Sequence, residues 1–115
     1  MPLPSSGEMS HFTTGAVRDA MQHKGLPSQM PMSALRAVSR RFEDGAEKYG
    51  RDNWKKGIPL SRYIDSIYRH LWDFMDGDEA EDHLSAVMWN AMCLYETKDR
   101  IDEETLPESL NDIGL

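Results

Sequence analysis

Three stretches of apolar residues at helical spacing, separated by glycine and proline, most restrict the fold of this chain. Within residues 33–50, 61–77 and 78–101, apolar side chains recur every three or four residues, which gathers them on one face of a helix. Ser33 and Ser61 suit the N-cap positions of the first two helices because their hydroxyls can accept a backbone amide. The sequence therefore predicts three helices, the third beginning near residue 78 or 79 and ending between 98 and 101.

The remaining segments do not continue this helical pattern. Residues 1–12 are rich in Pro, Ser and Gly and are expected to be a flexible N-terminus. Residues 13–32 contain two glycines and two prolines, so we expect an N-terminal loop or arm there, ordered by itself or by a ligand. No stretch alternates apolar and polar residues as a half-buried strand does. The expected class is all-α, a small helical bundle of three main helices within a domain at 13–100, followed by an acidic C-terminal tail at 101–115.

The composition argues against several classes of function. Lys and Arg number 13 against 20 Asp and Glu, a net charge of −7, which is the opposite of the basic footprint of a non-specific DNA binder. Cys93 is the single cysteine, so no intrachain disulfide forms and a reducing compartment is expected. No apolar run reaches the ~18 residues of a membrane span, and the N-terminus lacks the features of a signal peptide. We therefore expect a cytoplasmic protein that binds neither DNA nor a membrane.

The apolar content predicts self-association. Only 39% of the residues are hydrophobic and the mean hydropathy is −0.64, so the core of one chain is modest. The chain nevertheless has three Trp and eight Met side chains to bury from solvent. One small bundle does not easily bury that many. A homo-oligomer, either a dimer or a tetramer, is therefore expected.

The first predicted helix carries two carboxylates close to cations and aromatic rings. Glu43 and Glu47 stand four residues apart on one flank of the apolar face. Mg²⁺ prefers carboxylate oxygens, so the pair can hold a divalent cation. Lys48, Tyr49 and the segment 51–54 follow directly and suit a phosphorylated ligand that bears a ring. The alternative is a solvated strip whose charges only pair with one another.

A second acidic pair stands at the start of the third predicted helix. Glu79 and Asp82 are three residues apart, which makes them neighbours on a helix surface. They either complete a metal site with the first pair or form an acidic first turn that complements the helix dipole. His83 and Asn90 follow along the same helix and are candidates for the site or for a satisfied polar edge of the core.

His70 is the candidate of the second predicted helix, where it shares a flank with Ser66 and Asp73. Its imidazole could donate to a phosphate, bind a metal or orient a carboxylate. A histidine at the edge of an apolar face is also common as a structural residue. Both interpretations stay open from the sequence.

These residues form an ordered set of motifs that resembles a known family. The set covers roughly residues 13–96 and consists of Thr14-Gly15-Ala16-Val17-Arg18-Asp19, Lys24-Gly25, Phe42-Glu43-x-Gly45-Ala46-x-Lys48-Tyr49-Gly50-x-x-Asn53-Trp54-x-Lys56-Gly57, Arg69-His70-Leu71, His83-Leu84 and Trp89-Asn90. It resembles the phage dATP/dGTP diphosphohydrolases, which are similar to the MazG-like all-α nucleoside triphosphate pyrophosphatases. The domain at 13–100 is accordingly expected to be a MazG-like nucleotide pyrophosphohydrolase.

The resemblance implies a reaction and a setting. The reaction is Mg²⁺- or Mn²⁺-dependent cleavage of dGTP or dATP between the α- and β-phosphates, giving the monophosphate and pyrophosphate. The setting is a phage that adjusts the nucleotide pool in the host cytoplasm, where relatives supply dGMP as a precursor of 2-aminoadenine DNA.

The resemblance also implies ligands and catalytic residues. The metal ligands would be Glu43, Glu47, Glu79 and Asp82, and the catalytic residues Glu43, Glu47 and His70. The chain departs from the wider family pattern because Ala46 stands where the second acid of the first pair is expected, so Glu47 would take that role. Asp78 could replace Glu79 or Asp82 as a ligand.

Further polar and aromatic residues are expected to bind the nucleotide. Cationic side chains would contact the phosphate oxygens, and side-chain amides would form hydrogen bonds with the base or the sugar. Aromatic rings would stack on the base. These substrate-binding residues are Arg18, Lys24, Lys48, Tyr49, Asn53, Trp54, Arg69, His83 and Asn90. Since Arg18 and Lys24 lie in the segment 13–32, we expect that segment to close over the bound nucleotide. The rival functions are a non-catalytic acidic helical adaptor that binds a host protein and a nucleotide sensor without turnover.

Overall fold

A computed structural model describes residues 7–115. The chain divides into two compact units, one up to Met30 and one from Pro31 to Leu115. Residues 1–6 of the predicted flexible N-terminus lie outside the described residues.

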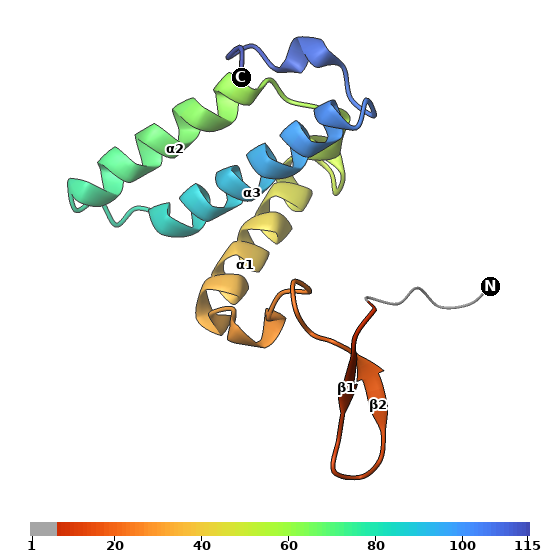
Figure 1. Cartoon of the computed structure of the whole chain (residues 1–115). Coiled ribbons are helices and arrows are strands. Elements are labelled where there is room, and N and C mark those ends of the chain that lie inside the picture. Colours follow the sequence, from red (N-terminus) through yellow and green to blue (C-terminus); the bar gives the residue numbers. More distant parts are fainter. Residues whose placement is uncertain (1–6) are drawn as a thin grey trace. The chain divides into compact units, whose positions relative to one another are not determined.

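The N-terminal unit contains a β-hairpin (Figure 1). Strands β1 (Met9–His11) and β2 (Val17–Asp19) pair antiparallel, with Ser10 opposite Arg18. The expectation of a chain without strands was wrong here. Each strand has only three residues, which is too short for period-two alternation to stand out in a sequence.

The hairpin loop fixes this pairing through its own hydrogen bonds. The amide of Phe12 donates to the carbonyl of Ala16 (3.0 Å), and the amide of Gly15 donates to the carbonyl of Phe12 (2.9 Å). Gly15 has a φ of 90°, a conformation that glycine adopts without steric strain. Residues 13–32 therefore contain a hairpin strand and a short 3-10 helix, η1 (Pro27–Gln29), and do not form a fourth core helix.

Three α-helices make up most of the second unit, which confirms the all-α class for the described residues. They are α1 (Met32–Tyr49), α2 (Leu60–Met75) and α3 (His83–Asp102), joined and followed by the 3-10 helices η2 (Asn53–Lys56) and η3 (Glu108–Leu110). None of the helices in residues 7–115 has the length and apolar character that crossing a membrane requires.

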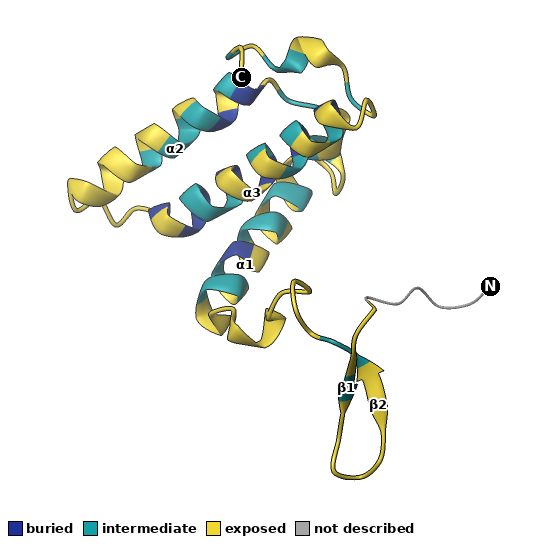
Figure 2. Cartoon of the chain, viewed as in Figure 1, coloured by how far each residue is buried: buried dark blue, intermediate teal, exposed yellow. Residues whose placement is uncertain are grey.

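Helix α3 is the most buried element and packs against both α1 and α2 (Figure 2). It contributes Ala86, Cys93 and Ile101 to the apolar core, together with the buried polar residues Asn90 and Thr97. The second half of α2 is largely exposed, although its sequence shows a broad apolar face. One chain therefore covers only part of the apolar surface that its helices present.

The helices begin at caps that differ from those predicted. Pro31 and Pro59 occupy the N-cap positions of α1 and α2, so Ser33 and Ser61 lie inside the first turns. The amide and hydroxyl of Ser61 instead donate to the carboxylate of Asp112, at 2.9 and 2.5 Å. A residue of the C-terminal tail thus satisfies a free amide at the start of α2.

The prediction that the third helix begins near residue 78 was wrong. Helix α3 begins at His83, because the Asp82 side chain accepts the amide of Ser85 (3.1 Å) and so acts as the N-cap. Residues 78–82 form a loop between α2 and α3. Glu79 and Asp82 are consequently not neighbours on one helix surface.

Candidate functional site

An open hollow of about 620 Å³ lies beside the C-terminal end of α1. Gly50, with a φ of 96°, ends the helix, and the chain returns as η2. The residues that line this hollow are Phe42, Glu43, Ala46, Arg51, Asp52, Trp54 and Lys55. A smaller adjoining hollow shares four of them and adds Gly45, Tyr49, Gly50, Asn53 and Trp89. We refer to both together as the α1 hollow.

The α1 hollow combines cations with aromatic walls. Phe42 stacks edge-on with Trp54 (centroids 6.2 Å apart) and contacts Trp89 (5.8 Å), which fixes the end of α1 on α3. Arg51 and Lys55 are exposed at its rim. Lys55 pairs with Asp52 (3.0 Å), and this hydrogen bond lowers the pKa of the Asp52 carboxyl. The arrangement suits an anionic ligand that also carries an apolar ring.

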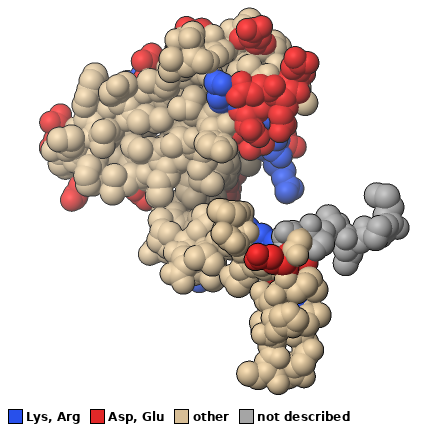
Figure 3. All heavy atoms as spheres, viewed as in Figure 1, with Lys and Arg blue, Asp and Glu red and all other residues tan. Residues whose placement is uncertain are grey.

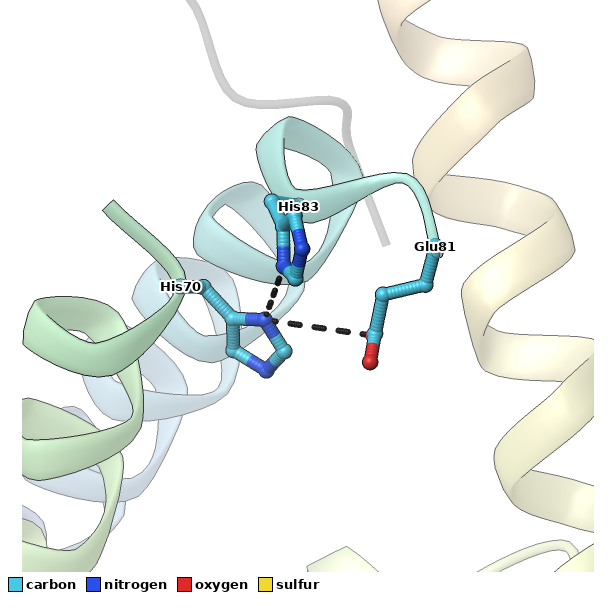
Figure 4. Close-up of side chains that lie close together, drawn as sticks. All are labelled: His70, Glu81 and His83. Atoms are coloured by element: carbon cyan, nitrogen blue, oxygen red, sulfur yellow. Dashed lines mark hydrogen bonds and ion pairs between the residues drawn. The ribbon is translucent and has the colours of Figure 1, made fainter. Parts of the chain in front are cut away.

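A second group of polar side chains gathers where α2 and α3 meet. Figure 4 shows the imidazole of His70, from α2, facing that of His83, at the first residue of α3, with Glu81 beside them. The two Nδ1 atoms are 2.9 Å apart, and His70 Nδ1 lies 3.9 Å from Glu81 Oε1. His83 Nε2 lies 2.5 Å from Asp78 Oδ2, and Arg41 of α1 donates to Glu81. We call these five residues the histidine cluster.

The hydrogen bonds of the histidine cluster determine its charge state. Burial lowers the pKa of His70, partly opposed by the charge of Glu81, so His70 is neutral at pH 7. The hydrogen bond with His83 lowers the pKa of Asp78, and that from Arg41 lowers the pKa of Glu81, so both carboxyls are ionised. Because Asp78 accepts the proton on His83 Nε2, the Nδ1 lone pair of His83 is the acceptor that faces His70. The cluster can therefore hold a cation or relay a proton.

One family accounts for nearly the whole described chain. The family described as dATP/dGTP diphosphohydrolase, N-terminal, matches residues 14–105. The chain belongs to this family. The match contains every residue of the α1 hollow and of the histidine cluster. Comparisons with the curated proteins and with the solved structures gave no match.

The structure does not bring together the four carboxylates that the family resemblance implies as metal ligands. Glu43 lines the α1 hollow, and Glu47 is exposed on α1 outside it. Glu79 and Asp82 line a different open hollow of about 440 Å³, next to His83. Within residues 7–115 the one group of three or more potential ligands that converge is His70, Glu81 and His83. The four carboxylates thus do not fit a single magnesium site within one chain, and their role stays a prediction.

The other predicted substrate-binding residues do not gather in one place. Tyr49, Asn53 and Trp54 line the α1 hollow, where the Trp54 ring is flanked by Lys55 and Arg100. Lys48 is exposed and lies over the Tyr49 ring (5.2 Å to its centroid).

Elsewhere, Arg69 donates to Ser66 (3.0 Å) on the surface of α2, and the buried Asn90 amide donates to the Ala86 carbonyl (2.8 Å). Arg18 and Lys24 are exposed in the N-terminal unit. Their predicted contact with a nucleotide stays a prediction, as does that of Arg69.

Sequence reasoning did not select three residues that contribute to these places. Lys55 lines the α1 hollow, and Arg41 and Glu81 belong to the histidine cluster. The position of Lys55 directly after Trp54 was a usable signal. The pairing of Arg41 with Glu81 joins residues 40 positions apart, and no local pattern indicates it.

Proposed function

We propose that this chain hydrolyses dATP or dGTP, in the presence of a divalent metal ion, to the deoxynucleoside monophosphate and pyrophosphate. The family to which it belongs is described by that substrate pair and matches residues 14–105. The observation that carries the proposal is the α1 hollow, where two carboxylates, two cations and aromatic walls face one space.

The hollow offers a contact for each part of a nucleotide. Arg51 and Lys55 would bind phosphate oxygens, since guanidinium and ammonium groups form charge-assisted hydrogen bonds with phosphates. Tyr49 is 62% exposed, so its ring could stack on the base. The side-chain amide of Asn53 could form hydrogen bonds with the base or the sugar. Stacking on Trp54 would compete with the cations that already flank its ring.

The reaction adds one water molecule across one phosphoanhydride bond. The water oxygen attacks the α-phosphorus, the bond from that phosphorus to the bridging oxygen breaks, and pyrophosphate leaves. Arg51 and Lys55 would hold the negative charge that develops on the phosphate oxygens. Glu43 is the predicted catalytic carboxylate that lines the hollow. A divalent metal ion supplies charge neutralisation and commonly needs only one or two protein carboxylates beside the phosphates.

The proposed setting is the one that the resemblance implies. The product dGMP would leave the pool of DNA polymerase substrates and become a precursor, as for 2-aminoadenine synthesis in a phage-infected cell. This part of the proposal rests on the resemblance alone.

Product identification tests the proposal. The purified chain is incubated with each dNTP and NTP, with Mg²⁺, with Mn²⁺ or with EDTA, and the products are separated by anion exchange. We expect pyrophosphate and monophosphate from dGTP or dATP, and none with EDTA. Release of inorganic phosphate, or no product with any nucleotide, would refute the proposal. Nucleotide binding without turnover would indicate a sensor, and no binding at all an adaptor.

Two adjacent lysines provide a matched pair of variants. Lys55 lines the hollow, whereas Lys56 is exposed and does not. Lys55→Ala should raise KM about tenfold or more because a phosphate contact is lost. Lys56→Ala should leave the kinetics unchanged. Equal effects of both substitutions would indicate only a general change of surface charge.

A further inference from the structure

We propose that His70, His83 and Glu81 form a binding site for a transition-metal dication of the Zn²⁺ type, separate from the magnesium requirement of the proposed hydrolysis. One ligand comes from each of three consecutive segments, namely α2, the loop 78–82 and the start of α3 (Figure 4). The site does not rest on the proposed function, because it is argued from the ligand geometry alone.

The spacing of the three ligand atoms is close to that of a four-coordinate metal. Bonds of ~2.0–2.1 Å to nitrogen and oxygen place neighbouring ligand atoms of a tetrahedral Zn²⁺ ~3.3 Å apart. The two Nδ1 atoms are 2.9 Å apart, and His70 Nδ1 is 3.9 Å from Glu81 Oε1. All three ligand atoms lie within 4.8 Å of one another. The imidazoles need to separate by a few tenths of an ångström, and the Glu81 side chain, which is 44% exposed, has room to turn inward.

Asp78 prepares His83 for a metal. Its carboxylate, 2.5 Å from His83 Nε2, accepts the proton on that nitrogen and leaves Nδ1 with a lone pair. This lone pair accepts from His70 Nδ1 here, and both Nδ1 atoms become ligands once His70 carries its proton on Nε2. A carboxylate that holds the far nitrogen of a histidine ligand fixes the tautomer and raises the basicity of the ligand nitrogen. The His83 side chain is 3% exposed, so its ring orientation is fixed by packing as well.

Arg41 places the third ligand. It donates to Oε1 of Glu81, the oxygen that faces His70, and keeps the carboxylate beside the two imidazoles. Because Arg41 and His70 both face Oε1, the carboxylate must turn so that Glu81 binds a metal through one oxygen and keeps Arg41 on the other. The two carboxylates of Asp78 and Glu81 outnumber the one guanidinium of Arg41, and this excess of negative charge favours a dication.

The site is also accessible and keeps a coordination position open. Asp78, Glu81 and His83 line the open hollow of about 440 Å³ at the start of α3, which gives an ion a path from solvent. Two histidines and one glutamate leave the fourth position of a tetrahedral ion to water or a ligand oxygen. Imidazole nitrogen suits Zn²⁺, Co²⁺ and Ni²⁺, whereas Mg²⁺ requires oxygen ligands.

Cobalt titration tests the site without any activity assay. The full chain, free of affinity tags and treated with chelator, is titrated with Co²⁺, and the visible spectrum is followed. We expect one Co²⁺ per chain with the intense bands of four-coordinate cobalt, displaced by Zn²⁺ and not by Mg²⁺. A spectrum of six-coordinate cobalt, or displacement by Mg²⁺, would overturn the proposal.

Variants assign the ligands. His70→Asn and Glu81→Gln, each replacing a side chain that is not fully buried, should weaken Co²⁺ binding on the order of 10²-fold, and Asp78→Asn about tenfold. His11→Asn and Asp76→Asn are matched controls outside the cluster and should bind as the wild type does. Far-UV circular dichroism verifies that each variant is folded. Wild-type affinity in folded His70→Asn would overturn the proposal.

The same proteins separate this proposal from the proposed function. If the wild type binds Co²⁺ through the cluster but hydrolyses no nucleotide, the metal site stands and the proposed function fails. If it hydrolyses dGTP with Mg²⁺ but binds no Co²⁺ through the cluster, the proposed function stands and the metal site fails.

Discussion

The α1 hollow and the histidine cluster are assembled in different ways. The hollow is built almost entirely from residues 42–55, with Trp89 of α3 as its one distant wall. The cluster combines Arg41, His70 and the segment 78–83, so it exists only once three helices have packed. A site made from one continuous segment can be read from the sequence, whereas a site that bridges helices cannot.

The two regions also differ in how their charges are used. In the hollow, Arg51 and Lys55 are exposed at the rim, where Lys55 also pairs with Asp52. In the cluster, Arg41 is bound to Glu81 and His83 to Asp78. The difference favours anion binding in the hollow and cation binding in the cluster. The predictions below test this division, from the largest expected effect to the smallest.

The largest effect is expected from Glu43→Gln, which removes the predicted catalytic carboxylate from the α1 hollow. We expect dGTP hydrolysis to fall on the order of 10²-fold or more at saturating Mg²⁺, with the helical content unchanged. Asp44→Asn, at the next residue and outside the hollow, should be nearly as active as the wild type. A fully active Glu43→Gln protein would show that hydrolysis does not depend on the carboxylate in the hollow.

The next prediction concerns the assembly. Large apolar side chains are exposed on α2 and α3, namely Tyr68, Leu71, Trp72, Phe74, Met75, Leu84, Met92 and Tyr95, and the face of these helices in Figure 3 carries few charges. Because a monomer rarely exposes so much apolar surface, we predict a homo-oligomer. Light scattering should give a multiple of 13.2 kDa, and Trp72→Glu should reduce that mass. A wild-type mass of one chain at micromolar concentration contradicts the prediction.

Replacing one phenylalanine in each region allows the packing of the two regions to be compared. Phe42 is half-buried between Trp54 and Trp89, whereas Phe74, beside the cluster, is 46% exposed. Phe42→Ala should lower the free energy of unfolding by about 2 kcal/mol, less than the ~3–5 kcal/mol of a fully buried phenylalanine. Phe74→Ala should cost less than about 1 kcal/mol. Urea unfolding measures both, and an equal cost would show that the cluster end is as tightly packed.

Acidification should destabilise the cluster before the hollow. Burial holds the pKa of His70 below its ordinary 6.5, so the unfolded chain takes up that proton first and stability falls as the pH drops below about 6.5. The lowered pKa values of Asp78 and Glu81 stabilise the fold above their ordinary 3.8 and 4.5, and that contribution is lost below them. In the hollow, the pKa of Asp52 is lowered from its ordinary 3.8, so its contribution to stability is lost only below pH 3.8.

Thermal unfolding at closely spaced pH values measures this difference. Between pH 6.5 and 5 the midpoint should decrease in the wild type and change less in His70→Asn. An identical slope in both proteins would show that His70 does not contribute.

The smallest effect concerns the N-terminal unit. We predict that residues 13–32 close over a bound nucleotide through Arg18 and Lys24, which are exposed in the described structure. Hydrogen exchange of amides in this segment should slow when a non-hydrolysable dGTP analogue and Mg²⁺ are added. Unchanged exchange, together with full turnover of a chain lacking the segment, would exclude this closure.

Individual positions explain which sequence predictions were confirmed. The end of α1 before Gly50 followed from the sequence, because the positive φ of that glycine is a local property. The caps did not, because Ser61 binds Asp112, a residue 51 positions away. The start of α3 shifted to His83 because Asp82 is the cap, and an acidic run alone does not indicate which acid takes that role.

By itself, the sequence determined the helical class, the grouping of Glu43, Tyr49, Asn53 and Trp54 beside one helix end, and the family. These depend on periodicity and on short segments, in which sequence distance and spatial distance agree. Only the tertiary structure decided that His70, Glu81 and His83 converge, and that Arg41 holds the carboxylate there. Their proximity arises from the packing of α1, α2 and α3, and packing depends on contacts between residues that no local pattern relates.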